Sequence, residues 1–149
     1  MDALAATGRR GIVHRGWANL DGGGNPNLHT IDDVPHHWLL PRMAAAVHHC
    51  GAGTTAATLR AGIPSIAVPG IMDQPFWAHR LHRLGVSPPP LRRTALTADD
   101  LAAAITAATT DPSHRQRAVD LAEQVRAEDG ELAATRIVEQ LLTTGALER

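Results

Sequence analysis

Lysine is absent from the 149-residue sequence, so every basic residue is an arginine, and cysteine occurs only once. The absence of lysine excludes a lysine nucleophile and the Gly-Lys-Ser/Thr phosphate loop from this chain. The single cysteine, Cys50, has no partner for a disulfide within the chain, and a lone thiol is typical of a reducing compartment. We therefore expect a cytoplasmic protein.

Long apolar runs are also missing. No stretch of about 18 apolar residues occurs, which is the length that spans a membrane. The N-terminal segment "MDALAATGRRGIVHRGW" lacks the apolar core of a signal peptide. The formal net charge is −1, so no excess of positive charge favours nucleic acid or an anionic membrane surface. We expect no transmembrane segment and no nucleic-acid partner.

Short apolar segments alternate with helical ones. The segments "GIVHRGW" (11–17), "AAAVHHC" (44–50) and "IPSIAVPG" (63–70) are expected to be strands. Helices are expected over 53–61 and 73–84, and in three pieces over 97–143 that begin at Thr97, Asp111 and Glu131. Strands that alternate with helices predict an α/β fold, a Rossmann-like parallel sheet with flanking helices.

The stretch "VHHCGAGTTAATLRAGIP" (47–64) takes a strand through a glycine turn into a helix. The free N–H groups and dipole of such a helix N-terminus form an anion site, which glycine lets a phosphate approach. Two interpretations compete once the phosphate loop is excluded. "GAGTTA" fits the dinucleotide pattern G-x-G-x-x-A, although Asp73 lies beyond the next strand instead of at its end. Alternatively, the turn binds no ligand.

The order of these motifs resembles a known signature. "HHCGAGTTAATLRAGIPSIAVPGIMDQPFWAHRLHRLGV" (48–86) resembles the donor-binding signature of nucleotide-sugar glycosyltransferases of the GT-B fold. The preceding "VPHHWLLPRMAAAVHHCG" (34–51) is similar to the sterol and macrolide glucosyltransferase branch. The resemblance, with its signature over 34–86, implies that residues 1–149 form a single, incomplete donor-binding domain, the C-terminal half of a GT-B enzyme.

The resemblance also implies roles for individual residues. The diphosphate of the donor would be bound by His49, Gly51, Gly53 and Thr54. The sugar hydroxyls would be bound by Asp73 and Gln74. The nucleobase would lie close to Val34 and Trp38. For Trp38, a role in packing is favoured over a role in binding the nucleobase.

Two positions depart from the plant members of this family. Asp33 and Ala57 stand where those members carry a uracil-stacking aromatic residue and a ribose-binding glutamate. The choice of UDP over dTDP therefore rests on the sterol-like resemblance alone.

The implied reaction is an inverting transfer from a UDP-sugar, UDP-glucose above all, to a lipophilic hydroxyl acceptor such as a sterol or macrolide. No catalytic residue is assigned within this chain, because the family carries its general base on an N-terminal acceptor domain. That domain as a separate polypeptide, or self-association, would complete the cleft. The alternatives are a truncated, catalytically inactive nucleotide-sugar-binding module and an NAD(P)-binding domain.

No cofactor or metal is expected. A cluster of His36, His37, His48, His49 and Cys50 is disfavoured as a zinc site, because adjacent strand residues point to opposite faces. His79 and His82 are interpreted as part of a solvated helix face.

Overall fold

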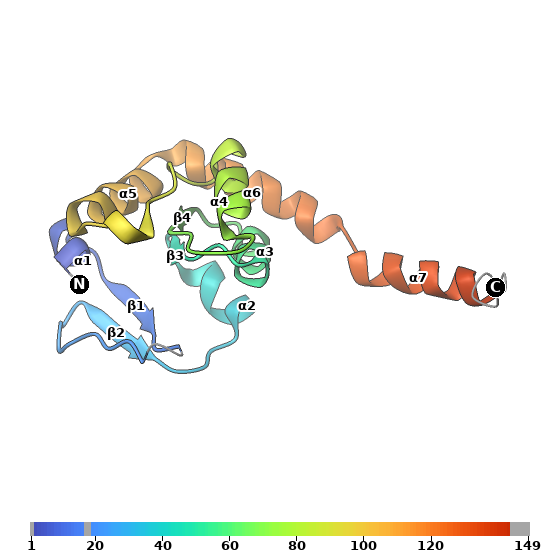
Figure 1. Cartoon of the computed structure of the whole chain (residues 1–149), viewed down its shortest axis with the longest axis horizontal. Coiled ribbons are helices and arrows are strands. Elements are labelled where there is room, and N and C mark those ends of the chain that lie inside the picture. Colours follow the sequence, from blue (N-terminus) through green and yellow to red (C-terminus); the bar gives the residue numbers. More distant parts are fainter. Residues whose placement is uncertain (1, 17–18, 144–149) are drawn as a thin grey trace.

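The computed structural model describes residues 2–16 and 19–143, and its centre is a pair of parallel strands (Figure 1). β3 (Ala46–His48) and β4 (Ser65–Ala67) pair in parallel, with Val47 opposite Ile66. The connection between them is α3 (Ala52–Ala61), which ends at Gly62 in a left-handed conformation with a φ of 69°. This strand–helix–strand unit is the core of the Rossmann-like class predicted from the sequence.

A second parallel pair lies beside the first. β1 (Gly11–His14) pairs with β2 (Leu28–Ile31), a strand that the sequence analysis missed. The helix α1 (Asp2–Thr7), also missed, packs against α5 (Ala98–Thr110). The expected α/β class with parallel strands is confirmed, with the strands of the described residues in two separate pairs. The expected strand over 11–17 ends at residue 14, and residue 17 lies outside the described residues.

Helices cover both faces of the β3–β4 pair. Since successive side chains of β4 point to opposite sides, this strand packs against both layers of helices. Ile66 packs with Ile105 and other apolar residues of α5. Ala67 packs on the other face with Cys50 and Leu81, in a cluster to which α4 (Gln74–Arg83) and α6 (Pro112–Ala127) contribute. The core is therefore split into two layers by one short strand pair.

The helix starts follow local capping chemistry. Thr97 caps α5 by accepting a hydrogen bond from the Asp100 N–H at 3.1 Å, and Asp111 caps α6 by accepting from the Ser113 N–H at 2.8 Å. Both starts were predicted. The shorter elements are α2 (His36–Leu39), η1 (Leu40–Arg42) and η2 (Arg93–Ala95).

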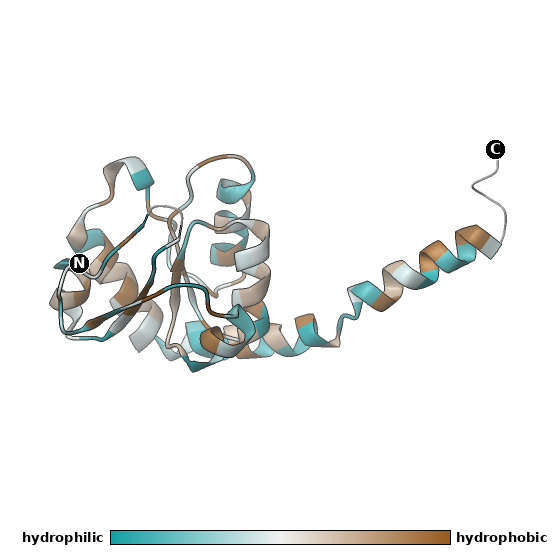
Figure 2. Ribbon diagram, turned by 90° about the horizontal axis from the view of Figure 1, so that it is seen from below, coloured by the Kyte–Doolittle hydropathy of each residue, from teal (hydrophilic) through white to brown (hydrophobic). Residues whose placement is uncertain are grey.

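The last described helix, α7 (Gly130–Thr143), extends away from the body of the molecule (Figure 1). Apolar and polar residues alternate along it (Figure 2), and none of its residues is buried. Leu132, Ile137, Val138 and Leu142 are between 44% and 66% exposed. Gly130 was expected to separate α6 from this helix. It is instead the first residue of α7, because Asp129 accepts from the Leu132 N–H at 2.9 Å and so begins the helix.

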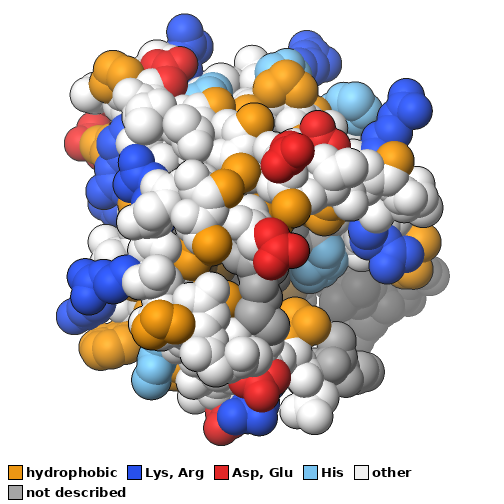
Figure 3. All heavy atoms as spheres, turned by 90° about the vertical axis from the view of Figure 1, so that its left-hand side faces the viewer, with side chains coloured by type: hydrophobic (Ala, Val, Ile, Leu, Met, Phe, Trp, Pro, Cys, Tyr) orange, Lys and Arg blue, Asp and Glu red, His pale blue; other side chains and the backbone are white. Residues whose placement is uncertain are grey.

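Charges of both signs are interspersed on the face of the molecule that Figure 3 shows. This distribution agrees with the near-zero net charge and shows no continuous basic patch on that face. Among the described residues, no helix combines the length and the apolar character needed to cross a membrane.

Candidate functional site

The carboxyl ends of β3 and β4 bring two predicted segments to one edge of the strand pair. Because the strands are parallel, the turn 49–51 after β3 and the loop 68–73 after β4 leave at the same edge. The Val68 N–H donates to the His48 carbonyl at 3.0 Å and continues the pairing past the end of β4. The predicted diphosphate residues and the predicted sugar residues therefore share this edge.

His48 connects the two strands beneath that edge. Its side chain is buried, with Nδ1 accepting from the Cys50 N–H at 3.2 Å. Nδ1 therefore carries no proton, and Nε2 donates to the Ser65 hydroxyl at 3.0 Å. Burial, with smaller contributions from His49 and His36, lowers the pKa of His48 from 6.5 to about 4. His48 is thus a neutral structural histidine. No such role was predicted for His48 from the sequence, although the alternation of side chains along a strand puts it on the opposite face from His49.

Cys50 forms the turn itself. Its φ of 67° lies in the left-handed region, which is uncommon for a residue other than glycine. The side chain is completely buried, and burial raises the pKa of the thiol to about 11. A protonated, enclosed thiol is not a nucleophile at neutral pH, so we assign Cys50 a structural role.

His49 and Gly51 form the exposed side of the turn. His49 is exposed, and an ideal Cβ on Gly51 would lie 2.5 Å from His49 Nε2. The imidazole therefore lies directly over Gly51, which caps the N-terminus of α3 without any side-chain hydrogen bond among the described residues. An imidazole and uncapped helix N–H groups provide the donors that an anion requires.

Gly53 and Thr54 lie in the first turn of the same helix. An ideal Cβ on Gly53 would meet no described atom within 4 Å, so the helix surface is open there. Thr54 is half-buried, and its carbonyl accepts from the Thr58 hydroxyl at 2.8 Å. The structure thus brings together the four residues predicted to bind a diphosphate.

Asp73 and Gln74 lie at the start of α4. The Gln74 Oε1 atom accepts from the N–H groups of Gly70 and Ile71, at 2.8 and 3.1 Å. Asp73 Oδ2 accepts from the Trp77 indole at 2.9 Å. Gln74 therefore fixes the loop before α4 with its one carbonyl oxygen, and Asp73 fixes the Trp77 side chain of α4 with one of its two carboxylate oxygens. The Gln74 amide NH₂ group and Asp73 Oδ1 are the atoms left to bind a ligand.

Val34 and Trp38 lie ahead of β3, in the loop before α2 and in α2 itself. Val34 is half-buried, whereas Trp38 is 52% exposed. The guanidinium of Arg42 lies over the Trp38 ring, 4.5 Å from its centroid. This exposure disfavours the interpretation of Trp38 as a packing anchor. α2, which carries Trp38, packs against α3.

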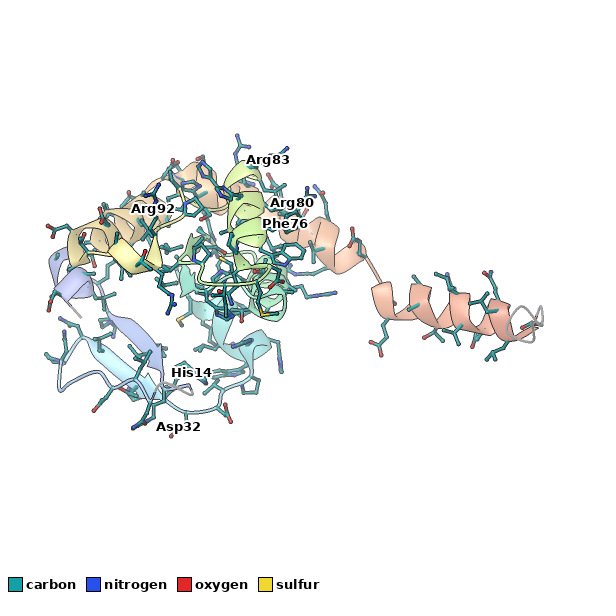
Figure 4. All side chains as sticks on the ribbon, viewed as in Figure 1. His14, Asp32, Phe76, Arg80, Arg83 and Arg92 are labelled. Atoms are coloured by element: carbon teal, nitrogen blue, oxygen red, sulfur yellow. The ribbon has the colours of Figure 1, made fainter. Side chains whose placement is uncertain are left out.

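The remaining histidines are spread over the molecule. His14 lies at the end of β1, 3.6 Å from Asp33, and Figure 4 shows it on a different part of the molecule from Phe76 of α4. Within residues 2–16 and 19–143, no group of three or more His, Cys, Asp or Glu side chains is arranged to hold a metal ion.

An uncapped helix N-terminus beneath a histidine, at the carboxyl edge of parallel strands that also carries an acid–amide pair, is the place at which α/β proteins bind anionic ligands. Comparison with known proteins specifies the family. Residues 11–142 match the model of the family described as "Erythromycin biosynthesis protein CIII-like, C-terminal domain". The chain belongs to this glycosyltransferase family, and the resemblance stated from the sequence is confirmed.

Curated relatives include enzymes for sterols and for an antibiotic aglycone. The chain is 41% identical over 138 residues to sterol 3-beta-glucosyltransferase UGT80A2 of Arabidopsis thaliana, covering 91% of this chain and 22% of that protein. It is 41% identical over 146 residues to the vancomycin aglycone glucosyltransferase of Amycolatopsis orientalis, covering 93% and 33%. The chain thus spans between a fifth and a third of the length of these relatives.

Solved glycosyltransferases share the fold. The glycotransferase of kitacinnamycin superposes with a TM-score of 0.77 at 26% identity, covering 87% of this chain and 34% of that one. Glycosyltransferase VinC, solved in complex with DTDP, superposes with a TM-score of 0.65 at 32% identity, covering 69% and 26%.

The buried His48 predicts a loss of stability in acid. The unfolded chain takes up a proton at this residue near pH 6.5, but the folded chain does so only near pH 4. The stability that the neutral imidazole contributes is complete above pH 6.5 and is lost as the pH falls through this window. We expect a loss of about 2 kcal/mol between pH 7 and pH 5.

Urea unfolding at both pH values tests this expectation. His48→Gln should be less stable at pH 7 but should lack most of this pH dependence. His79→Gln, on the exposed side of α4, should retain it. An equal pH dependence in His48→Gln and the parent chain would show that another group causes it.

Proposed function

We propose that the chain is the donor-binding half of a glycosyltransferase that uses a UDP-sugar, with UDP-glucose as the donor. The observation that supports this most is the position of His49 over Gly51 at the uncapped start of α3, on the same edge as Asp73 and Gln74. Family membership supports the reaction class. The sterol glucosyltransferases among the relatives support glucose and a lipophilic hydroxyl acceptor.

In the proposed reaction, the acceptor hydroxyl oxygen attacks the anomeric carbon while the bond from that carbon to the diphosphate oxygen breaks, with inversion. Negative charge grows on the leaving diphosphate. The N–H groups at the start of α3 and the His49 imidazole would stabilise that charge, as fixed donors do elsewhere. Asp73 and Gln74 would orient the sugar, and a base on an acceptor domain would take the hydroxyl proton.

We further propose that this chain acts with an N-terminal acceptor domain, on a second polypeptide or through self-association, in the cytoplasm. The apolar side chains exposed on α7 support such a partner, since several exposed apolar residues on one helix are typical of interaction surfaces. The buried, free thiol of Cys50 agrees with a reducing compartment.

The proposal predicts that His49→Ala binds UDP less tightly than the parent chain. Loss of a hydrogen bond to a charged group costs about 1–3 kcal/mol, which is roughly a 5- to 150-fold increase in Kd. Isothermal titration calorimetry measures this change, with His79→Ala as the matched exposed-histidine control. Binding of NADH without binding of UDP would show that the domain is a dinucleotide-binding one.

Gly53→Ala separates ligand binding from folding. Because the added methyl meets no described atom within 4 Å, the variant should be more stable by about 0.4–1 kcal/mol. The same methyl would occupy the space of the bound diphosphate, so affinity for UDP should fall. Gly130→Ala is the control, because its added methyl is equally unhindered at the start of α7, remote from the turn. Unchanged UDP affinity in Gly53→Ala would place the diphosphate elsewhere.

The proposal also predicts that the isolated chain does not transfer a sugar to an acceptor by itself. With UDP-glucose and a sterol, the isolated chain should form no glycoside detectable by mass spectrometry, because the proposed reaction takes its acceptor wall and its base from the acceptor domain. Adding a separately expressed N-terminal acceptor domain of a relative should produce glycoside. Efficient transfer by the monomeric chain alone would mean that one of its own histidines, among them His14, His36 and His37, serves as the base.

A further inference from the structure

Arg93 reaches the sugar end of the proposed site from a third segment of the chain. An ideal Cβ on Gly70 would lie 3.3 Å from Arg93 Nε, 3.8 Å from Arg93 Cδ and 3.1 Å from Gln74 Oε1. The side chains of Arg93 and Gln74 therefore lie together on the side of Gly70 where any other residue would carry its Cβ. A glycine at position 70 permits this close approach.

Backbone pairing explains why Arg93 is there. β4 uses Val68 N–H and the Pro64 carbonyl to pair with β3. Alternate residues of a strand direct their N–H and C=O groups to opposite sides. Ser65 and Ala67 accordingly pair on the other side, where the Ser65 N–H donates to Val86 at 2.9 Å and the Ala67 carbonyl accepts from Leu91 at 2.9 Å.

The segment 86–91 thus runs along the edge of β4 that does not pair with β3. The short helix η2 begins two residues after Leu91. Three segments therefore follow one another across the carboxyl edge of the strands. They carry His49 after β3, Gln74 after β4 and Arg93 after the segment 86–91. Arg93 lies at the end of this row that is remote from the diphosphate turn.

The guanidinium of Arg93 is available to a ligand. Its side chain is exposed, and no acidic side chain of the described residues forms an ion pair with it. A guanidinium only donates hydrogen bonds, and the nearby Gln74 Oε1 already accepts two from Gly70 and Ile71. Oxygen atoms of a bound sugar would supply further acceptors, in addition to the Asp73 Oδ1 atom.

We propose that Arg93 donates hydrogen bonds to the sugar of the bound nucleotide sugar, beside Gln74, and that a carboxylate on the sugar would report this contact more strongly than a hydroxyl. This inference rests on the proposed function. A carboxylate can accept two parallel hydrogen bonds from a guanidinium, and such charge-assisted bonds are about twice as strong as neutral ones. A hydroxyl would accept a weaker one.

Calorimetry with UDP, UDP-glucose and UDP-glucuronate tests the proposal on the full chain. In Arg93→Ala, Kd should rise roughly tenfold for UDP-glucose and roughly a hundredfold for UDP-glucuronate, and should stay within about twofold for UDP. Arg93→Lys should recover part of the loss, because it keeps the charge but not the paired geometry. Arg92→Ala is the matched control, because Arg92 is the adjacent exposed arginine and is not among the three nearest contacts of the Gly70 position, and it should leave all three affinities within about twofold.

Other results would overturn the proposal. Equal losses for UDP and both UDP-sugars would show that Arg93 only supports the loop at Gly70, and unchanged affinities would show that it does not contact the sugar. In both cases the parent chain still binds nucleotide sugars, so the proposed function stands. A parent chain that binds none of the three ligands overturns the proposed function and the role of Arg93 together.

Discussion

The rest of the site depends on the hydrogen bonds of one buried imidazole. His48 accepts from the Cys50 N–H with one ring nitrogen and donates to the Ser65 hydroxyl with the other. It thereby joins the last residue of β3, the turn that follows and the first residue of β4. The ring has to be neutral to make both bonds, because a protonated Nδ1 cannot accept. Burial favours that neutral form, so the same environment that encloses the side chain also maintains its hydrogen bonds.

The two adjacent histidines, His48 and His49, have different roles. His48 faces inward and maintains the geometry of the turn, while His49 faces solvent over Gly51. The left-handed conformation of Cys50 redirects the chain between the strand and α3. As a result, the N-terminus of α3 opens toward the carboxyl edge of the strands, where an anion would meet helix N–H groups and an imidazole at once. An arrangement of this kind relies on donors that are fixed before the ligand arrives.

The end of the edge that carries Asp73 and Gln74 is organised by hydrogen bonds of these two side chains. Gln74 uses its carbonyl oxygen to hold the loop at Gly70, and Asp73 uses one oxygen to hold Trp77. Both side chains are thus oriented by neighbouring groups, and under the proposed function their remaining polar atoms would meet the ligand. Arg93 lies beside them because the segment after α4 pairs along the free edge of β4. Oriented side chains lose less conformational freedom when a ligand binds.

The sequence by itself determined features that depend on neighbouring residues. The caps at Thr97 and Asp111 lie within three residues of the N–H groups they bind, and the ordered motifs over 34–86 identified the family. Tertiary structure decided what depends on distant residues. β2 was missed because its four residues gain their strand pairing from β1. Arg93 was missed because it meets Gly70 only through pairing along β4, and such contacts leave no periodic signal in the sequence around either residue.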